Sequence, residues 1–196
     1  MTNLPDSSTK MQSAGELRAR AWVVAVLCAI FWIQLADAST AAPSEDQVKA
    51  AFLLNFPKYV DWPQGSFADA SSPIVITVVA DKGVENELRL IADGKTFNGR
   101  PMQIVATIEA GVAPHIVFID ASRNRRLGES IRNLCGQSVL TVGEGDDFFD
   151  AGGIIRLARR DRKIRLEIDL VQADAAGLKL SSKLLAVSDV VRRRNR

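Results

Sequence analysis

The sequence feature that most constrains the fold is an unbroken apolar run at residues 74–80, which is rich in β-branched side chains. A run of this kind predicts a strand that is buried on both faces of a parallel sheet. Similar runs occupy residues 116–119 and 139–142, and helical candidates lie at 84–92 and 122–134. Because parallel neighbours need a crossover connection, this order predicts right-handed βαβ units.

The C-terminal half adds a different pattern. Apolar and charged residues alternate strictly over 164–170, as in a strand with one face in water. With the apolar run at 154–158 and the charged segment at 159–163, this pattern predicts a β-hairpin. A last amphipathic helix is predicted at 180–191. We therefore expect an α/β fold of three layers, in which a mainly parallel sheet is flanked by helices and carries an added antiparallel β-hairpin.

The first helix of this fold is predicted to begin at Ser44, because Gln47 completes a capping box three residues later. Apolar side chains follow at steps of four: Val48, Phe52, Phe56 and Val60. Pro57 interrupts this stripe. Since proline removes a helical hydrogen bond, we expect a kink or an early end there.

Residues 1–38 have the composition of an export signal. Their basic side chains come first: Lys10, Arg18 and Arg20. The uncharged apolar segment 21–33 follows, and it is too short for a comfortable membrane span, which needs about 20 residues. It suits the core of a signal peptide, and the small-x-small pattern at 36–38 predicts cleavage after Ala38.

Other interpretations of this segment stay open. Translation from Met11 would still produce a complete signal, and an uncleaved segment would anchor the protein in the membrane. Cys28 follows Leu27 rather than a small residue, so it is a poor site for lipid attachment. This segment contains no adjacent pair of arginines, so nothing in it indicates export by the twin-arginine route.

Cleavage leaves residues 39–196, enough for a single domain with a sizeable core. It removes three basic and three acidic residues, so the mature chain keeps the net charge of +2. This balance gives no indication of nucleic-acid binding. The basic C-terminal cluster is either a solubilising tail or a contact for anionic lipid or an acidic partner; its members are Arg192, Arg193, Arg194 and Arg196.

The cysteines exclude an internal disulfide. Cys28 leaves with the signal, so the mature protein carries Cys135 alone in an oxidising compartment. Its thiol is expected either to be buried as a small hydrophobic group or to form an intermolecular disulfide.

The sequence contains no recognisable catalytic apparatus. His115 is the only histidine and stands directly before the buried run at 116–119, where a structural role is more common than catalysis. No serine lies in a G-x-S-x-G elbow, and one histidine with one mature cysteine cannot assemble a zinc site. We therefore predict no catalytic, cofactor-binding or metal-binding residue, and a protein that is not an enzyme.

Charged residues provide two weaker candidate sites. Carboxylates gather in the loop after the predicted strand at 139–142, as a solvated turn or as part of a ligand site; they are Glu144, Asp146, Asp147 and Asp150. Their spacing matches no calcium loop. Three cations could bind an anion if the fold brings them together: Lys58, Arg100 and Arg165.

Several stretches together resemble the YfiR family of periplasmic regulatory proteins. The N-terminal ones are VKAAFLLNF at 48–56 and KYVDWP at 58–63, and the central ones are NGRP at 98–101 and HIVFI at 115–119. The C-terminal ones are VLTVG at 139–143, the glycine pair at 152–153, RLEI at 165–168 and AGLKLSSKLL at 176–185. Their order and completeness over 44–190 make the resemblance specific.

The resemblance implies regulation rather than catalysis. Proteins of this type are periplasmic repressors that bind the periplasmic portion of a membrane-bound diguanylate cyclase and restrain cyclic-di-GMP synthesis. An outer-membrane lipoprotein relieves that restraint in the best-known system, so that biofilm growth responds to envelope stress. The family also implies an α/β sheet flanked by helices and a tendency to form homodimers.

Some residues depart from the family pattern. Pro114 stands where a cysteine is common, and Cys135 has no internal partner, which argues against control by an internal disulfide. Pro57, Leu166 and Asp169 also differ from the usual residues. These departures affect the predicted first helix and the partner surface.

The richest aromatic group in the sequence provides the candidate partner-binding residues: Phe52, Phe56, Tyr59 and Trp62. Aromatic side chains dominate interface energetics where they are exposed, and they fill the core where they are not. The alternative function is a periplasmic ligand-sensing or solute-binding module that uses the loop at 143–150.

Overall fold

The computed structural model describes residues 42–79, 81–106, 113–120, 127–161 and 163–191. All the elements below lie in the compact unit that begins at Pro43. The predicted signal at 1–38 and the basic tail at 192–196 lie outside the described residues.

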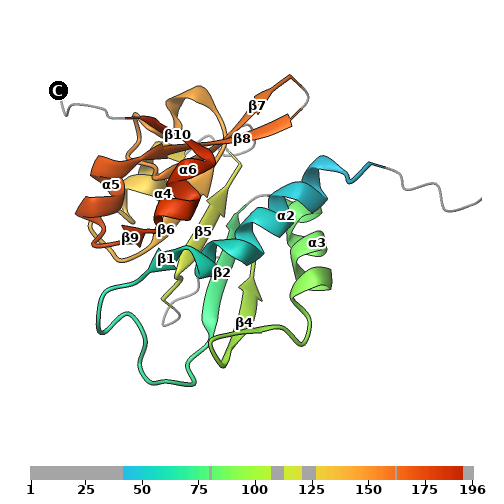
Figure 1. Cartoon of the computed structure of the whole chain (residues 1–196), viewed down its shortest axis with the longest axis vertical. Coiled ribbons are helices and arrows are strands. Elements are labelled where there is room, and N and C mark those ends of the chain that lie inside the picture. Colours follow the sequence, from blue (N-terminus) through green and yellow to red (C-terminus); the bar gives the residue numbers. More distant parts are fainter. Residues whose placement is uncertain (1–41, 80, 107–112, 121–126, 162, 192–196) are drawn as a thin grey trace, which may run out of the picture. The chain divides into compact units, whose positions relative to one another are not determined.

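An eight-stranded sheet forms the centre of the fold, with the strand order β10-β8-β7-β6-β5-β2-β4-β3 (Figure 1). Its strands are β2 (Ile74–Val79), β3 (Thr96–Phe97), β4 (Arg100–Val105), β5 (Ile116–Ile119), β6 (Leu140–Gly143), β7 (Ile155–Arg160), β8 (Lys163–Asp169) and β10 (Ser188–Val191). Neighbours are parallel except in the pairs β7–β8 and β3–β4. The predicted α/β class and the predicted hairpin are therefore confirmed.

Helices connect these strands. They are α2 (Glu45–Asn55), α3 (Lys82–Ala92), α4 (Leu127–Arg132), α5 (Leu170–Ala175) and α6 (Ser182–Ala186), with the short 3₁₀ turns η1 (Phe56–Lys58) and η2 (Asp146–Phe148). A small antiparallel sheet joins β1 (Val60–Asp61) to β9 (Lys179–Leu180). Of the helix predicted at 122–134, α4 is present, and residues 121–126 lie outside the described residues.

The sheet is buried on both faces. Along β5, Ile116 and Phe118 pack into a cluster that contains Leu53 of α2 and Leu88 of α3. Val117 and Ile119 face the other way and pack with a second cluster, which includes residues at and after α4. The predicted burial of this strand on both faces is confirmed.

The start and the end of α2 follow from local chemistry. The Ser44 hydroxyl accepts a hydrogen bond from the Gln47 backbone, and the Gln47 side chain accepts one from the Ser44 backbone. The helix ends at Asn55, and Pro57 lies in η1. Both the predicted capping box and the predicted early end are confirmed.

The helix predicted at 180–191 is wrong. Ser181 caps a helix that ends at Ala186, and Ser188–Val191 then forms β10, which pairs with β8 in parallel. The apolar residues fit a helical period, but the open edge of β8 offers backbone hydrogen bonds to a β-branched segment such as Val190-Val191. This tertiary contact overrides the local pattern.

Candidate functional site

A large apolar groove of about 670 Å³ lies between α2, η1, β8 and α6. We call it the apolar groove. Its lining consists of Pro43, Gln47, Val48, Ala51, Phe52, Asn55, Phe56, Tyr59, Leu166, Lys183, Leu184 and Val187. This volume lies within the range of about 300–1,000 Å³ that is typical of ligand pockets.

The first wall of the groove is one face of α2. Val48, Phe52 and Phe56 are four residues apart, so they lie on the same side of the helix. The Phe52 and Phe56 rings stack with centroids 6.3 Å apart. Phe56 is buried and forms the floor, whereas Phe52 is partly exposed.

The opposite wall comes from the C-terminal part of the chain. Leu166 lies on β8, Leu184 lies on α6, and Val187 follows α6 with 70% of its surface exposed. The Ser181 backbone N–H donates to the Tyr59 carbonyl at 2.9 Å, and β1 pairs with β9. These backbone bonds hold the two walls together.

Two polar side chains of the groove, those of Gln47 and Asn55, are already satisfied. Gln47 takes part in the capping box. Asn55 donates to the Ala51 carbonyl and accepts from the Lys58 ammonium at 2.6 Å. Contacts made inside the groove are therefore mainly apolar.

The structure brings together three of the four predicted partner-binding residues. Phe52, Phe56 and Tyr59 line the groove, but Trp62 does not. The Trp62 ring instead meets Phe67 and His115 edge-on, with centroids 6.2 Å away in each case. The partner surface predicted from the sequence thus divides between a groove and an aromatic cluster.

His115 connects a loop to the sheet. Its Nδ1 accepts from the Val75 backbone at 3.1 Å, and its Nε2 lies 3.0 Å from the Ser66 carbonyl. Burial lowers the pKa of His115, so the ring is neutral and its Nε2–H donates to Ser66. Both ring nitrogens are bound to backbone groups, which leaves neither of them for proton transfer.

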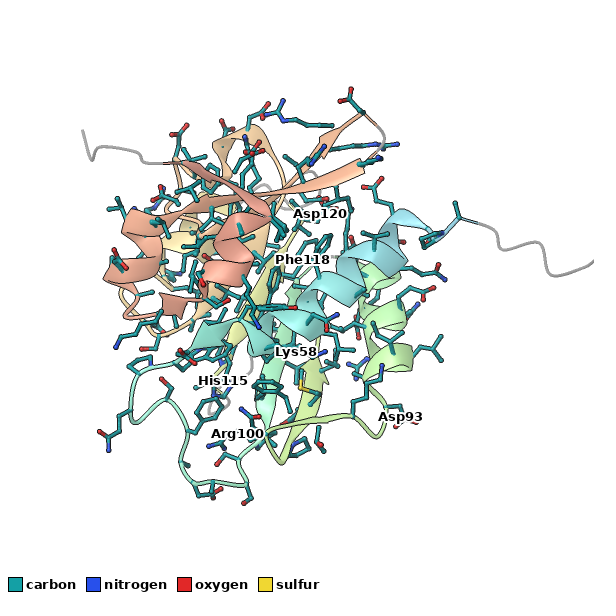
Figure 2. All side chains as sticks on the ribbon, viewed as in Figure 1. Lys58, Asp93, Arg100, His115, Phe118 and Asp120 are labelled. Atoms are coloured by element: carbon teal, nitrogen blue, oxygen red, sulfur yellow. The ribbon has the colours of Figure 1, made fainter. Side chains whose placement is uncertain are left out.

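Figure 2 shows Phe118 between His115 and Asp120 along β5.

The acidic loop lies at the carboxyl end of β6, as predicted. Glu144 accepts from the Lys49 ammonium at 3.0 Å, and Lys49 also pairs with Glu45 at 2.9 Å. Burial raises the pKa of Glu144, and the neighbouring carboxylates of Asp120 and Glu45 add to this effect. Lys49 therefore neutralises a crowded acidic site.

A second, polar cleft of about 300 Å³ lies next to this loop, between α2 and β7. Its arginines are all engaged: Arg156 binds Asp146 and Glu167, Arg160 binds Glu167, and Arg159 binds Glu45. Within the residues that the structure describes, no group of three or more His, Cys, Asp or Glu side chains could hold a metal ion.

The three cations proposed as an anion site share no contact among the described residues. Lys58 binds Asn55, and Arg100 donates to the carbonyls of Asp69 and Ser72 and lies over the Phe67 ring. Arg165 is exposed on β8. The geometry gives no support to a joint anion site.

Cys135 is exposed, so the expectation of a buried thiol is wrong. The helix α4 ends at Arg132, three residues before it, and Cys135 lies in the turn that follows. An intermolecular disulfide stays a prediction.

The sequence profile of YfiR/HmsC-like proteins matches residues 46–189, which include both walls of the groove. The chain belongs to the YfiR/HmsC-like family. No curated protein matches the chain. Membership of the YfiR/HmsC-like family supports a regulatory rather than a catalytic role, in cyclic-di-GMP signalling.

Sequence reasoning missed the second wall of the groove. Leu184 and Val187 fell within the helix predicted at 180–191, and Leu166 was noted only as a departure from the family pattern. The one available signal was the mixture of apolar residues in this segment, which cannot indicate which of them meet α2.

No helix within the described ranges has the length and apolar character to cross a membrane.

Proposed function

We propose that this protein is a periplasmic regulator that binds the periplasmic portion of a membrane-bound diguanylate cyclase and lowers its output of cyclic-di-GMP. Its membership of the YfiR/HmsC-like family supports this theme. The predicted signal at 1–38 would place the mature chain, 39–196, in the periplasm. From there it reaches cytoplasmic signalling through a partner that spans the membrane.

The observation that carries the proposal is the apolar groove. Phe52, Tyr59 and Val187 present apolar surface to solvent on walls that backbone hydrogen bonds hold in place. A preformed apolar groove can accept the apolar face of a partner helix, and aromatic side chains are frequent anchors in such contacts. The candidate contact residues are therefore Phe52, Phe56 and Tyr59, with Val187 added. Trp62 lies in another cluster and is not part of this surface.

Two further associations are part of the proposal. An outer-membrane lipoprotein would release the cyclase by sequestering this protein, and the protein would form homodimers. A ligand-sensing role based on the acidic loop is less well supported, because the arginines of the polar cleft are already paired with carboxylates.

The proposal is tested by a pair of matched variants. Val187 is 70% exposed at the groove, and Leu90 is 74% exposed on α3 and does not line it. The mature protein serves as bait for solubilised inner membranes of its own host, with the captured cyclase identified by mass spectrometry. Val187→Glu should lower capture at least about tenfold, since it places a charge in an apolar contact. Leu90→Glu should capture normally.

Cyclic-di-GMP measured in the same cells provides the second readout. Expression of the wild-type protein or of Leu90→Glu should lower its level, and Val187→Glu should not. Equal capture and equal repression by the two variants would place the partner surface elsewhere. Failure of the wild-type protein to capture a diguanylate cyclase would overturn the proposed function. N-terminal sequencing of the periplasmic protein, expected to begin at Ser39, tests the export step.

A further inference from the structure

The apolar groove carries one cation that has no partner. Lys183 is the one charged side chain among the lining residues. Its ammonium makes no hydrogen bond or ion pair with any residue that the structure describes, unlike the ammonium of Lys49 or of Lys58. The groove therefore combines a large apolar surface with a single free positive charge.

A second cation, Lys58, belongs to a segment that is bonded to the start of α6. The Ser181–Tyr59 backbone bond joins the start of α6 to η1, and Lys58 directly precedes Tyr59. Lys58 and Lys183 thus belong to segments that meet at one end of the groove. The lining contains no carboxylate that would repel an anion there.

We propose that the apolar groove binds an amphiphilic monocarboxylate, a molecule with one carboxylate and an unbranched apolar tail. The tail lies between Val48, Phe52 and Leu184, and the carboxylate pairs with Lys183. Because the same surface is assigned above to the cyclase, the bound amphiphile displaces the partner. This regulatory step rests on the proposed function, whereas the binding step does not.

The binding step is tested on the isolated mature protein by calorimetry with octanoate, decanoate and dodecanoate below their micellar concentrations. The affinity should rise about fourfold for each methylene group that leaves water, until the groove is filled. Decanol has the same number of carbon atoms as decanoate but no charge, and it should bind about fivefold more weakly, as expected for loss of a partly exposed ion pair.

Three variants locate the site. Lys183→Ala should weaken decanoate binding about fivefold and leave decanol binding unchanged. Lys95→Ala is the matched control, because Lys95 is exposed and does not line the groove. Ala51→Trp should abolish binding, since Ala51 is an exposed lining residue whose enlargement fills the groove without disturbing the core.

The outcomes separate the two proposals. Absence of decanoate binding to the wild-type protein, equal binding of decanoate and decanol, or unchanged binding by Ala51→Trp would each overturn the ligand proposal. If decanoate binds as expected, adding it to the captured cyclase complex should release the wild-type protein, and Lys183→Ala should need about fivefold more decanoate for the same release. Retention of the complex would overturn the regulatory step. Failure to form any cyclase complex would count against the proposed function alone.

Discussion

Lys49 on α2 contacts Glu144, 95 residues later in the chain, with 2.9 Å between the ammonium nitrogen and a carboxylate oxygen. Both side chains are largely buried, with 7% and 23% exposed, respectively. The contact joins the helix that forms the first wall of the apolar groove to the carboxyl end of β6. Burial opposes the charge on Lys49, but its bonds to Glu45 and Glu144 outweigh this effect and raise its pKa.

Loss of this ammonium is expected to destabilise the fold. Lys49→Met should lower the free energy of unfolding by about 2 kcal/mol, because it leaves Glu144 buried beside other carboxylates. The double variant Lys49→Met/Glu144→Gln should lose less than the sum of the two single changes. Urea denaturation of the four proteins measures this coupling.

A matched control for Lys49→Met is Lys82→Met. The Lys82 side chain is 78% exposed, and its partner Glu85 keeps a second ion pair with Arg89 when Lys82 is replaced. Its removal should change the free energy of unfolding by less than about 0.5 kcal/mol. Equal losses for the two lysines would contradict a specific role for the Lys49–Glu144 contact.

His115 is expected to make stability depend on pH. Burial holds its folded-state pKa below the ordinary value, so the unfolded chain binds a proton before the folded protein does. The contribution of the neutral His115 ring to the free energy of unfolding is complete above the pKa of the unfolded chain, about 6.5. It is lost as the pH falls from that value through the pKa of the folded protein. Stability should therefore fall on acidification in this window.

The single histidine makes this prediction direct to measure. In an untagged protein one imidazole Cε1–H resonance should titrate by NMR, with a midpoint below about 6.5. His115→Gln cannot be protonated in this range, so its urea midpoint should lack the corresponding part of the pH dependence. A titration midpoint at or above the ordinary histidine pKa of about 6.5 would contradict a buried, neutral His115 ring in the folded protein.

The parts of the fold that depend on local chemistry could be predicted from the sequence. The cap at Ser44 can be predicted because it depends only on Gln47, three residues away. The strand β2 can be predicted because its burial depends only on its own run of apolar side chains. The helix predicted at 180–191 was wrong because its outcome depends on the open edge of β8, which no local pattern contains.

The groove shows the same limit. Phe52 and Tyr59 were recognised as candidate contact residues because aromatic side chains are conspicuous in a sequence. Val187 and Lys183 were not, because their segment comes next to α2 only in the folded chain, through the Ser181–Tyr59 backbone bond and the β1–β9 pairing. A site built from segments more than 100 residues apart cannot be assembled from periodicity.

Cys135 is expected to react in the native state. Its side chain is exposed, and cleavage at the predicted site after Ala38 would leave it as the only thiol of residues 39–196. A maleimide reagent should label the folded protein to about one equivalent, as expected for an accessible thiol. Oxidation should produce a covalent dimer on a non-reducing gel, and Cys135→Ser should abolish it. Labelling that requires denaturant would contradict the exposed position.

Phe148 provides a test of packing beside the acidic loop. Its ring is fully buried between Gly143 and Gly153, and a Cβ atom added at either glycine would overlap the ring. At Gly143 the new atom would also lie 2.7 Å from the Ile119 carbonyl oxygen. Gly153→Ala should therefore lower the free energy of unfolding by about 2–3 kcal/mol, the cost of overpacking a core.

The matched control for this change is Gly94→Ala, because Gly94 has open space around it and a φ of 63°. Only backbone strain opposes alanine there, so the expected loss is about 1 kcal/mol. Phe148→Leu removes part of the ring, so adding it to Gly153→Ala should cost less than the sum of the two changes. Additive losses would mean that the clash with Phe148 is not the cause.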